Sequence, residues 1–156
     1  MNIRKATGTD SLALSRLSRD VQSLHAQRHP NVFRMPDSDE FAISFFEERL
    51  ADPAATIFIA EENGEMLGCI LCKLIERPEN PFTFASRYLL IDQISVLPAA
   101  QGRGIGASLM HRADLLADEL HVQRMQLDSW DFNIQAHKFF ESHGYNKFTF
   151  RFWKWL

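Results

Sequence analysis

The segment that decides the fold runs from Leu89 to Gly106 and reads LLIDQISVLPAAQGRGIG. Its apolar part predicts a strand that stops at Pro98, and the apolar spacing after Gly104 predicts an amphipathic helix over residues 104–120. Glycines in the intervening turn adopt positive φ at little cost and let the backbone approach an anion closely. Because the first N–H groups of a helix lack partners and lie at the positive end of its dipole, this turn predicts an anion-binding site.

Apolar periodicity on both sides of this segment predicts a single α/β domain over residues 1–156. The expected order is β-α-α-β-β-β-α-β-α-β, which gives a mixed sheet with helices on both faces. Asn63-Gly64, between two strand-like runs, predicts a tight hairpin turn. Strands are expected over residues 2–6, 56–60, 66–75, 87–97, 124–129 and 145–156, and helices over residues 10–29, 39–51, 104–120 and 134–142.

The composition argues against several classes of protein. With a net charge of −3 and a pI near 6.1, the chain lacks the clustered positive charge that nucleic-acid binding needs. No stretch approaches the roughly 20 apolar residues that span a bilayer, and the polar N-terminus predicts no secretion signal. We therefore expect a cytoplasmic protein that binds neither nucleic acid nor membrane.

Cys69 and Cys72 form a C-x-x-C pattern inside an apolar run that is typical of a buried strand. Residues three apart on a strand face opposite sides and lie about 10 Å apart, which forbids a disulfide or a shared metal ion. We therefore expect two buried thiols and a reducing compartment. His25 and His29 have the spacing of a metal pair, but no third ligand accompanies them, so no metal is expected.

By itself the glycine-rich turn is a weak signal. It contains neither G-x-G-x-x-G nor a P-loop lysine, so dinucleotide-binding and P-loop interpretations fit poorly. A helix that begins at glycines and binds no ligand is the alternative at this stage.

Two motifs together resemble the GNAT superfamily of acetyltransferases. The family signature Q/R-x-x-G-x-G/A is matched by Gln101, Gly104 and Gly106, a short distance after an apolar strand. The run from Asn133 to Tyr145 is similar to the family segment N-x-x-A-x-x-F-Y-x-x-x-G-F. The opening strand and helix cap, from Ile3 to Asp10, are similar as well, so the resemblance covers the chain in element order.

The resemblance implies a mostly antiparallel sheet of six to seven strands, splayed between strands 4 and 5. It implies that acetyl-CoA lies in this cleft as co-substrate, with its pantetheine arm paired to the backbone of Ile94 and Val96 like an added strand. The pyrophosphate would take the N–H groups of the glycine turn. For Phe139 and Phe140, ordinary helix-core packing is the alternative. The implied cofactor-binding residues are Ile94, Ser95, Val96, Gln101, Gly102, Arg103, Gly104, Ile105, Gly106, Asn133, Ala136, Phe139 and Phe140.

The reaction implied is N-acetylation, in which a neutral primary amine of a small molecule or peptide attacks the thioester directly in a ternary complex. The N–H of Val96 is the implied carbonyl polariser. A free alkyl amine has a pKa of about 10, so a base is needed, and Asp92 is the candidate. Strict alternation places Asp92 on the face of Ile94 and Val96 unless a bulge intervenes. An Asp bonded to a neighbouring loop is the alternative.

One position departs from the family pattern. Phe140 stands where many members carry a tyrosine proposed to protonate the leaving sulfur, and phenylalanine donates no proton. A thiol with a pKa of about 8.5 still leaves tolerably as thiolate. Because of this departure, an acyl-CoA-binding sensor with little or no turnover is the alternative function. Tyr145 is expected to be a core residue.

The acceptor pocket is expected at the end of the first helix. His25 and Phe33 lie in a stretch that looks like the loop lining this pocket in some family members. The loop from residue 76 to 87 and the two N-terminal helices are expected to shape the pocket. The last strand has Phe148, Phe150 and Phe152 on one face. It allows a homodimer, because exposed edges with Trp153 and Trp155 invite burial.

Overall fold

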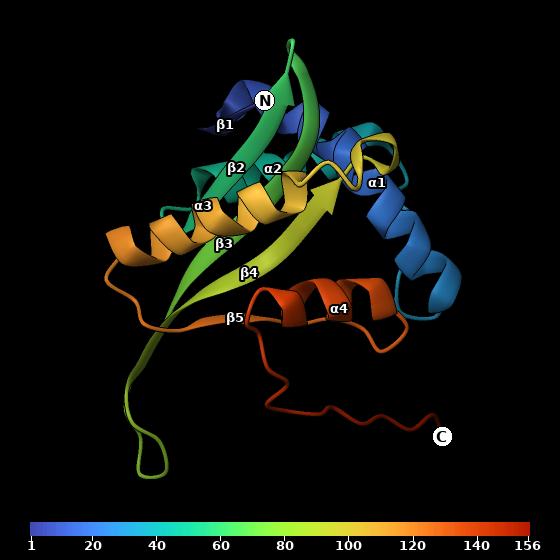
Figure 1. The fold of residues 1–156 in the computed structure, drawn as a ribbon. Coiled ribbons are helices and arrows are strands. Elements are labelled where there is room, and N and C mark those ends of the chain that lie inside the picture. The colour runs from blue at the N-terminus through green and yellow to red at the C-terminus, as the bar shows by residue number, and fades with distance from the viewer.

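The computed structural model describes residues 1–156 and contains one sheet with the strand order β1-β2-β3-β4-β5 (Figure 1). Neighbouring strands are antiparallel except β4 and β5, which run parallel, so the sheet is mixed as expected. The strands are β1 (Asn2–Lys5), β2 (Ala55–Glu62), β3 (Glu65–Arg77), β4 (Ser86–Val96) and β5 (Met125–Leu127). The helices are α1 (Ser11–Arg28), α2 (Asp39–Ala51), α3 (Ile105–Glu119) and α4 (Ile134–Ser142), with 3₁₀ turns η1 (Gly8–Asp10) and η2 (Pro98–Ala100).

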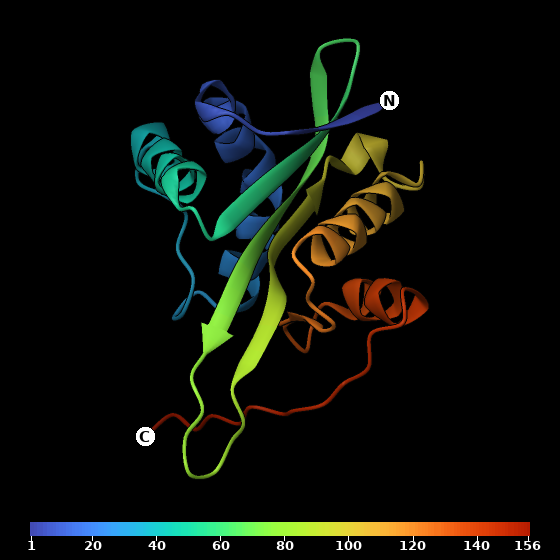
Figure 2. The same cartoon turned by 90° about the vertical axis from the view of Figure 1, so that its left-hand side faces the viewer.

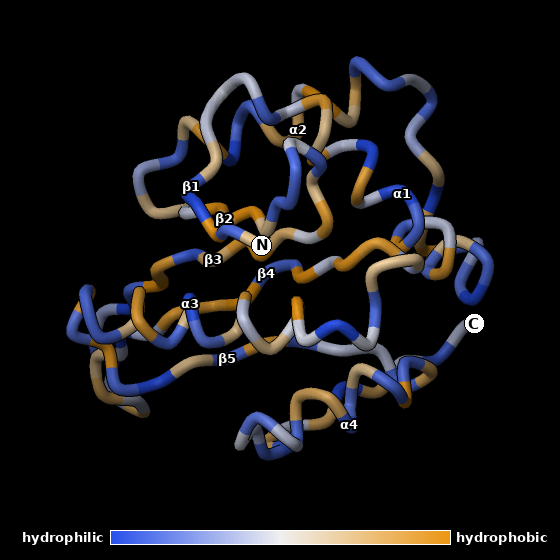
Figure 3. The backbone as a smooth tube through the Cα atoms, turned by 45° about the horizontal axis from the view of Figure 1, so that its top comes forward, coloured by the Kyte–Doolittle hydropathy of each residue, from blue (hydrophilic) through white to orange (hydrophobic).

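Helices cover both faces of the sheet, with α1 and α2 on one side and α3 and α4 on the other (Figure 2). One apolar cluster joins Leu109 of α3 to Ile70 of β3. The cluster on the opposite face joins Leu14 of α1 and Phe46 of α2 to Ile59 of β2. The strongest hydrophobic colouring follows the strands between these helix layers (Figure 3). The sheet is therefore held by a core on each side.

The two hairpins of the sheet differ in reach. Between β2 and β3 the chain turns at Asn63 and Gly64, whose φ values of 52° and 83° match the turn that Asn-Gly predicts. The tip between β3 and β4, residues 78–85, protrudes beyond the helices (Figures 1 and 2). The tip lies before β4 in the chain and the glycine turn lies after it. At roughly 3.3 Å per residue, the length of β4 separates the tip from the glycine turn by about 30 Å. The tip is thus remote from the glycine turn.

Cys69 and Cys72 are free thiols buried on opposite faces of β3, as the sequence predicts. Cys69 belongs to the cluster under α1 and α2, and Cys72 to the cluster under α3. Burial raises the pKa of each thiol to about 12. The structure contains no group of three His, Cys, Asp or Glu side chains placed to hold a metal ion. None of its helices combines the length and the apolar character needed to cross a membrane.

A charged contact ties β1 to the start of α1. The Arg4 guanidinium donates to both carboxylate oxygens of Asp10, each at 2.9 Å, and to Glu61 at 3.0 Å. The Thr7 N–H donates to the Asp10 carboxylate at 2.8 Å. Arg4, and then Thr7, lower the pKa of the buried Asp10 carboxyl from 3.8 to about 2. Asp10 is therefore a charged anchor at the entry to the first helix.

The C-terminal segment, residues 145–156, corrects the expected strand count. It forms no strand, so the sheet has five strands where six to seven were expected. Residues 146–156 make no backbone–backbone hydrogen bond. A strand exists only where a neighbour pairs its N–H and C=O groups, and no neighbouring strand lies along this segment. The segment instead leaves α4 and extends away from the sheet (Figure 1).

Candidate functional site

The two edges of β4 are unlike. Toward β3 it is paired from Ser86↔Arg77 to Val96↔Gly68, with one register shift between Ile91 and Gln93. Toward β5 the pairing covers only Leu89–Ile91 against Met125–Leu127. Beyond Ile91 the second half of β4 has no partner on that side, and Figure 1 shows it rising away from β5. The expected opening between the fourth and fifth strands is therefore present.

The backbone of Ile94 and Val96 faces this open edge. The Leu97 N–H donates to the Leu67 carbonyl at 2.9 Å, which fixes the alternation of the β3–β4 ladder. Hydrogen-bonded and non-hydrogen-bonded pairs alternate in antiparallel sheets. The backbone N–H and C=O groups of Ser95 therefore bond to β3, whereas those of Ile94 and Val96 point away from it. Ser95 is therefore placed differently from Ile94 and Val96. Its backbone belongs to the ladder, and its side-chain hydroxyl is buried without a partner.

A β-bulge at Asp92 corrects the face expected for this residue. Leu71 pairs with Gln93 and Cys72 with Ile91, so Asp92 is the extra residue on β4. Ile91, Ile94 and Val96 all pack against the α3-side cluster, which strict alternation would not allow. Asp92 therefore does not share their face by simple alternation. Its carboxylate is exposed and makes no hydrogen bond or ion pair within the chain, so the alternative of a loop-bonded Asp is not observed.

The glycine turn presents unpartnered N–H groups to solvent. Gly102 and Gly104 have φ values of 75° and 77°, and a Cβ added at either would meet nothing within 4 Å. Ser108 donates the first helical hydrogen bond, to the Gly104 carbonyl at 3.0 Å. The N–H groups of Ile105, Gly106 and the residue after it consequently have no partner within α3. Open space, positive φ and free donors at a helix start are the features that suit an anion.

The polar side chains of the turn are already engaged. Arg103 forms a 2.6 Å ion pair with Glu62 at the end of β2, and this contact lowers the pKa of the Glu62 carboxyl. Gln101 donates from Nε2 to the Val96 carbonyl at 3.3 Å, which links the turn to the end of β4. The anion site therefore relies on main-chain amides, and Arg103 reaches an anion only by leaving Glu62.

Helix α4 forms the far wall of the opening. Asn133 caps it by accepting a hydrogen bond from the Ala136 N–H at 3.3 Å. Phe139 lies against the glycine turn, because a Cβ on Gly106 would come within 3.1 Å of its ring. Phe140 is buried beside Phe139, with ring centroids 5.5 Å apart. A side chain at position 106 would therefore press on the Phe139 ring, so Gly106 favours the close approach of α3 and α4.

Tyr145, at the end of α4, is part of the core as expected. It packs against the α3-side cluster, and burial raises the pKa of its hydroxyl to about 12. That hydroxyl has no hydrogen-bond partner. Tyr88 is likewise buried, between Arg77 and Arg124, near the start of β4.

An aromatic cluster closes the end of the site nearest the C-terminus of α1. It joins the end of α1, the segment after it, the β5–α4 connection and the C-terminal segment. The His29 ring centroid lies 5.1 Å from that of Trp130, in a tilted arrangement, and 5.1 Å from that of Trp153, in an edge-on arrangement. The rings of the cluster are His25, His29, Phe33, Trp130, Phe132 and Trp153. Because α1 and the β5–α4 connection flank the sheet on opposite faces, the cluster spans the opening between β4 and β5.

His25 has a defined tautomer in this cluster. Its Nδ1 lies 2.7 Å from the Val21 carbonyl, which only accepts hydrogen bonds, so Nδ1 carries the proton. In the neutral ring Nε2 then keeps its lone pair and can accept a proton. His25 and Phe33 lie together, with ring centroids 4.9 Å apart.

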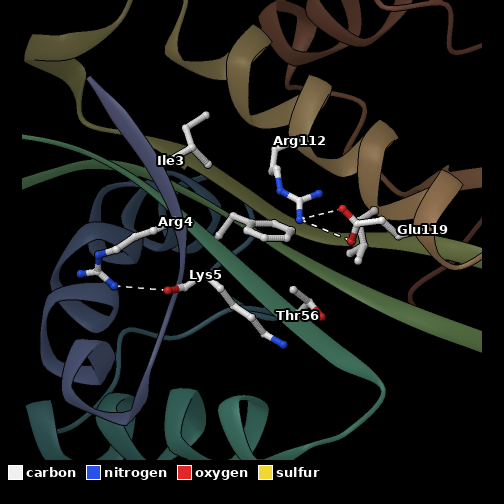
Figure 4. A pocket seen from close by; sticks show the side chains of 8 residues that line it. Ile3, Arg4, Lys5, Thr56, Arg112 and Glu119 are labelled. Atoms are coloured by element: carbon white, nitrogen blue, oxygen red, sulfur yellow. Dashed lines mark hydrogen bonds and ion pairs between the residues drawn. The ribbon is translucent and has the colours of Figure 1, made fainter.

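A separate cavity of about 280 Å³ lies between β1 and α3 (Figure 4). Its Arg112 is held by Glu119 at 3.1 Å and covers the Phe58 ring at 4.1 Å. Arg112 is therefore already paired. This cavity takes no part in the opening between β4 and β5.

Known proteins share this arrangement. Residues 19–145 match the Acetyltransferase (GNAT) family. The chain belongs to the GNAT acetyltransferase family. YhfO of Bacillus subtilis, an uncharacterized N-acetyltransferase, is 27% identical over 96% of this chain and 92% of its own.

Solved structures of acetyltransferases and related proteins show the same fold. A tetramutant of BH1408 protein from Bacillus halodurans superposes with a TM-score of 0.94 at 23% identity over 100% of both chains. The aminoglycoside N-acetyltransferase AAC(6')-Iy, in complex with CoA, superposes with a TM-score of 0.74 at 17% identity over 99% of both chains. The GNAT fold of this chain is therefore shown by sequence and by structure.

Some residues of the candidate site could not be identified from the sequence. Trp130, Phe132 and Trp153 join His25 and Phe33 only through contacts between segments distant in the chain. The only signal in the sequence was its high aromatic content, with 13 Phe and 3 Trp in 156 residues. Their positions follow from the fold and not from any local pattern.

Proposed function

We propose that this GNAT protein transfers an acetyl group from acetyl-CoA to a primary amine of a small molecule or peptide. The observation that carries the proposal is the row of unpartnered amides at the start of α3, joined by the open edge of β4. The CoA complex of AAC(6')-Iy, which has the same fold, supports CoA as the carrier. YhfO supports N-acetylation as the class of reaction.

The residues present fit the cofactor. The diphosphate would accept hydrogen bonds from the amides of residues 102–106, where positive φ and open space leave room for it. The pantetheine arm would pair with Ile94 and Val96, whose N–H and C=O groups face the open edge. Phe139 would flank the arm, and Asn133 and Ala136 would border it at the start of α4. The thioester would then lie near Val96, whose N–H polarises its carbonyl.

The acceptor amine would approach from the aromatic cluster. Its nitrogen attacks the acetyl carbonyl carbon, a C–N bond forms, the C–S bond breaks, and the amine proton goes to a base. Asp92 is the proposed base, acting through water, because its carboxylate is exposed and has no partner in the chain. His25 and Phe33 would line the acceptor side, with the unprotonated Nε2 of His25 available to a substrate N–H.

Many family members carry a proton-donating tyrosine at the position of Phe140. No other residue of this chain would supply that proton. Phe140 is buried, and the Tyr145 hydroxyl packs in the core. The sulfur would therefore leave as thiolate and take its proton from water, which a thiol pKa of about 8.5 permits.

Release of free thiol from acetyl-CoA across a panel of amino sugars, polyamines and peptide amines tests the proposal. We expect release that depends on one class of amine. Asp92→Asn should lower kcat by about 100-fold at unchanged CoA affinity, whereas the control Asp20→Asn, an exposed Asp on α1, should have no effect. Tight CoA binding with no thiol release for any amine would instead identify a sensor.

A further inference from the structure

The cavity between β1 and α3 carries charged groups that the proposed acetyl transfer does not use (Figure 4). Its volume of about 280 Å³ is near the lower end of the range found for small-molecule pockets. Three elements supply its polar walls, because Lys5 comes from β1, Thr56 from β2 and Arg112 from α3. Its apolar lining consists of Ile3, Phe58 and Leu116. The cavity is therefore amphipathic.

Several hydrogen-bond donors of this cavity lack acceptors. The Lys5 ammonium and the Thr56 hydroxyl have no hydrogen bond or ion pair, and Figure 4 shows the two side chains beside each other. Glu119 engages only Nη2 of Arg112, at 3.1 and 3.4 Å, whereas Nη1 is buried without a partner. A buried donor without an acceptor costs free energy, so an acceptor bound here would be stabilised.

The charged side chains that face the cavity sum to one positive charge. Lys5 and Arg112 are cations, and Glu119 is an anion. Arg4 also borders the cavity, but its guanidinium lies on the opposite face of β1, where two carboxylates already bind it. A monoanion therefore matches the cavity, whereas a dianion such as sulfate would face Glu119 with an unbalanced charge.

We propose that this cavity binds a small carboxylate that carries an apolar body. Its oxygens would accept hydrogen bonds from Lys5 Nζ and the Thr56 hydroxyl, and from Nη1 of Arg112 once the guanidinium turns toward them. The Arg112 side chain is 26% exposed, which leaves it room to turn. The apolar body would lie against the apolar lining. The site does not depend on acetyl transfer, and Arg112 lies about 10 Å along α3 from the glycine turn at 1.5 Å per residue.

The first test uses benzoate as the probe and benzamide, which has nearly the same shape without the charge, as its control. In an NMR titration of the full chain, benzoate should shift the amide resonances of Lys5, Thr56 and Arg112 together. Benzamide and sulfate should bind at least about tenfold more weakly, the first because it lacks the charge and the second because its extra charge meets Glu119. Equal binding of benzamide or sulfate, benzoate shifts confined to the glycine turn, or no binding of benzoate would overturn the proposal.

The second test changes two charges of the cavity in opposite directions. Lys5→Met removes the ammonium and should weaken benzoate binding at least about tenfold. Glu119→Gln removes the opposing charge and releases Arg112, so it should strengthen binding about threefold or more. The matched control Lys147→Met, at an exposed lysine after α4, should leave the affinity unchanged.

Both cavity variants should fold, because Lys5 and Glu119 are exposed, and circular dichroism checks this. Parent-like benzoate affinity in Lys5→Met, or weaker binding in Glu119→Gln, would refute the site.

Discussion

The two edges of β4 show how this molecule separates stability from function. The edge toward β3 is paired from Ser86 to Val96 except at the Asp92 bulge, and it lies between two buried clusters. The edge toward β5 is paired only at Leu89–Ile91, and beyond that point it opens beside the glycine turn and α4. One strand thus supports the core with one edge and offers backbone groups to a ligand with the other. We expect mutations on the closed side to change folding and mutations on the open side to change binding.

The largest expected effect lies on the closed side. Ile59→Ala removes a fully buried side chain of β2 in the cluster under α1 and α2. We expect a loss of about 3 kcal/mol in the free energy of unfolding, from lost burial and the cavity that remains. Urea denaturation measures this loss, and calorimetry on the folded fraction should show unchanged CoA affinity. A large loss of CoA affinity in the folded protein would contradict the claim that one edge of β4 supports stability and the other supports binding.

The next effect lies at the glycine turn. Gly104→Glu places a carboxylate beside the free amides at φ 77°, and we expect CoA affinity to fall at least about 100-fold. The control Gly104→Ala carries the same backbone strain, worth about 1 kcal/mol of stability, without the charge. It should keep most of the affinity, as measured by the thermal shift that CoA produces. Equal behaviour of the two variants would mean that strain, and not charge at an anion site, explains the loss.

A smaller effect is expected at the Asp10 anchor, far from the open edge. The folded pKa of Asp10 is lowered from 3.8 to about 2, so its contribution is complete above pH 3.8 and is lost as the pH falls toward 2. After allowance for solvent screening of the partly exposed Arg4, Asp10→Asn should cost about 1–2 kcal/mol at pH 7. The difference from the parent should shrink between pH 4 and pH 2 in denaturation curves. A constant difference across that range would contradict the ion-pair explanation.

The smallest effect is expected for Tyr145→Phe. The Tyr145 hydroxyl is buried without a partner, so its removal should leave stability unchanged or raise it by roughly 0.5–1 kcal/mol. Thiol release should also be unchanged, because the ring packs in the core. A pronounced fall in kcat at unchanged stability would make Tyr145 the proton donor that Phe140 cannot be.

Local sequence signals predicted the elements whose hydrogen bonds form between residues that are close together in the chain. The helix expected over residues 134–142 is α4, with Asn133 as its cap and Gly144 at positive φ after its end. The Asn63-Gly64 hairpin and the strand–turn–helix at the glycines are equally local. Each of these depends on hydrogen bonds within a few residues, which a sequence pattern encodes directly.

Features that depend on distant partners were not predictable. The tail has strand periodicity, but no strand of the sheet pairs with it in the structure. The bulge at Asp92 arises from the register of β4 against β3, and no sequence pattern within β4 predicts this register. The aromatic cluster likewise needs the relative positions of four segments.

The most direct test of the central claim is the structure of the protein bound to CoA. We expect the diphosphate oxygens within hydrogen-bonding distance of the amides of residues 102–106, and the pantetheine arm along Ile94 and Val96. A CoA diphosphate bound elsewhere, for example at Arg112 between β1 and α3, would contradict the assignment of the site.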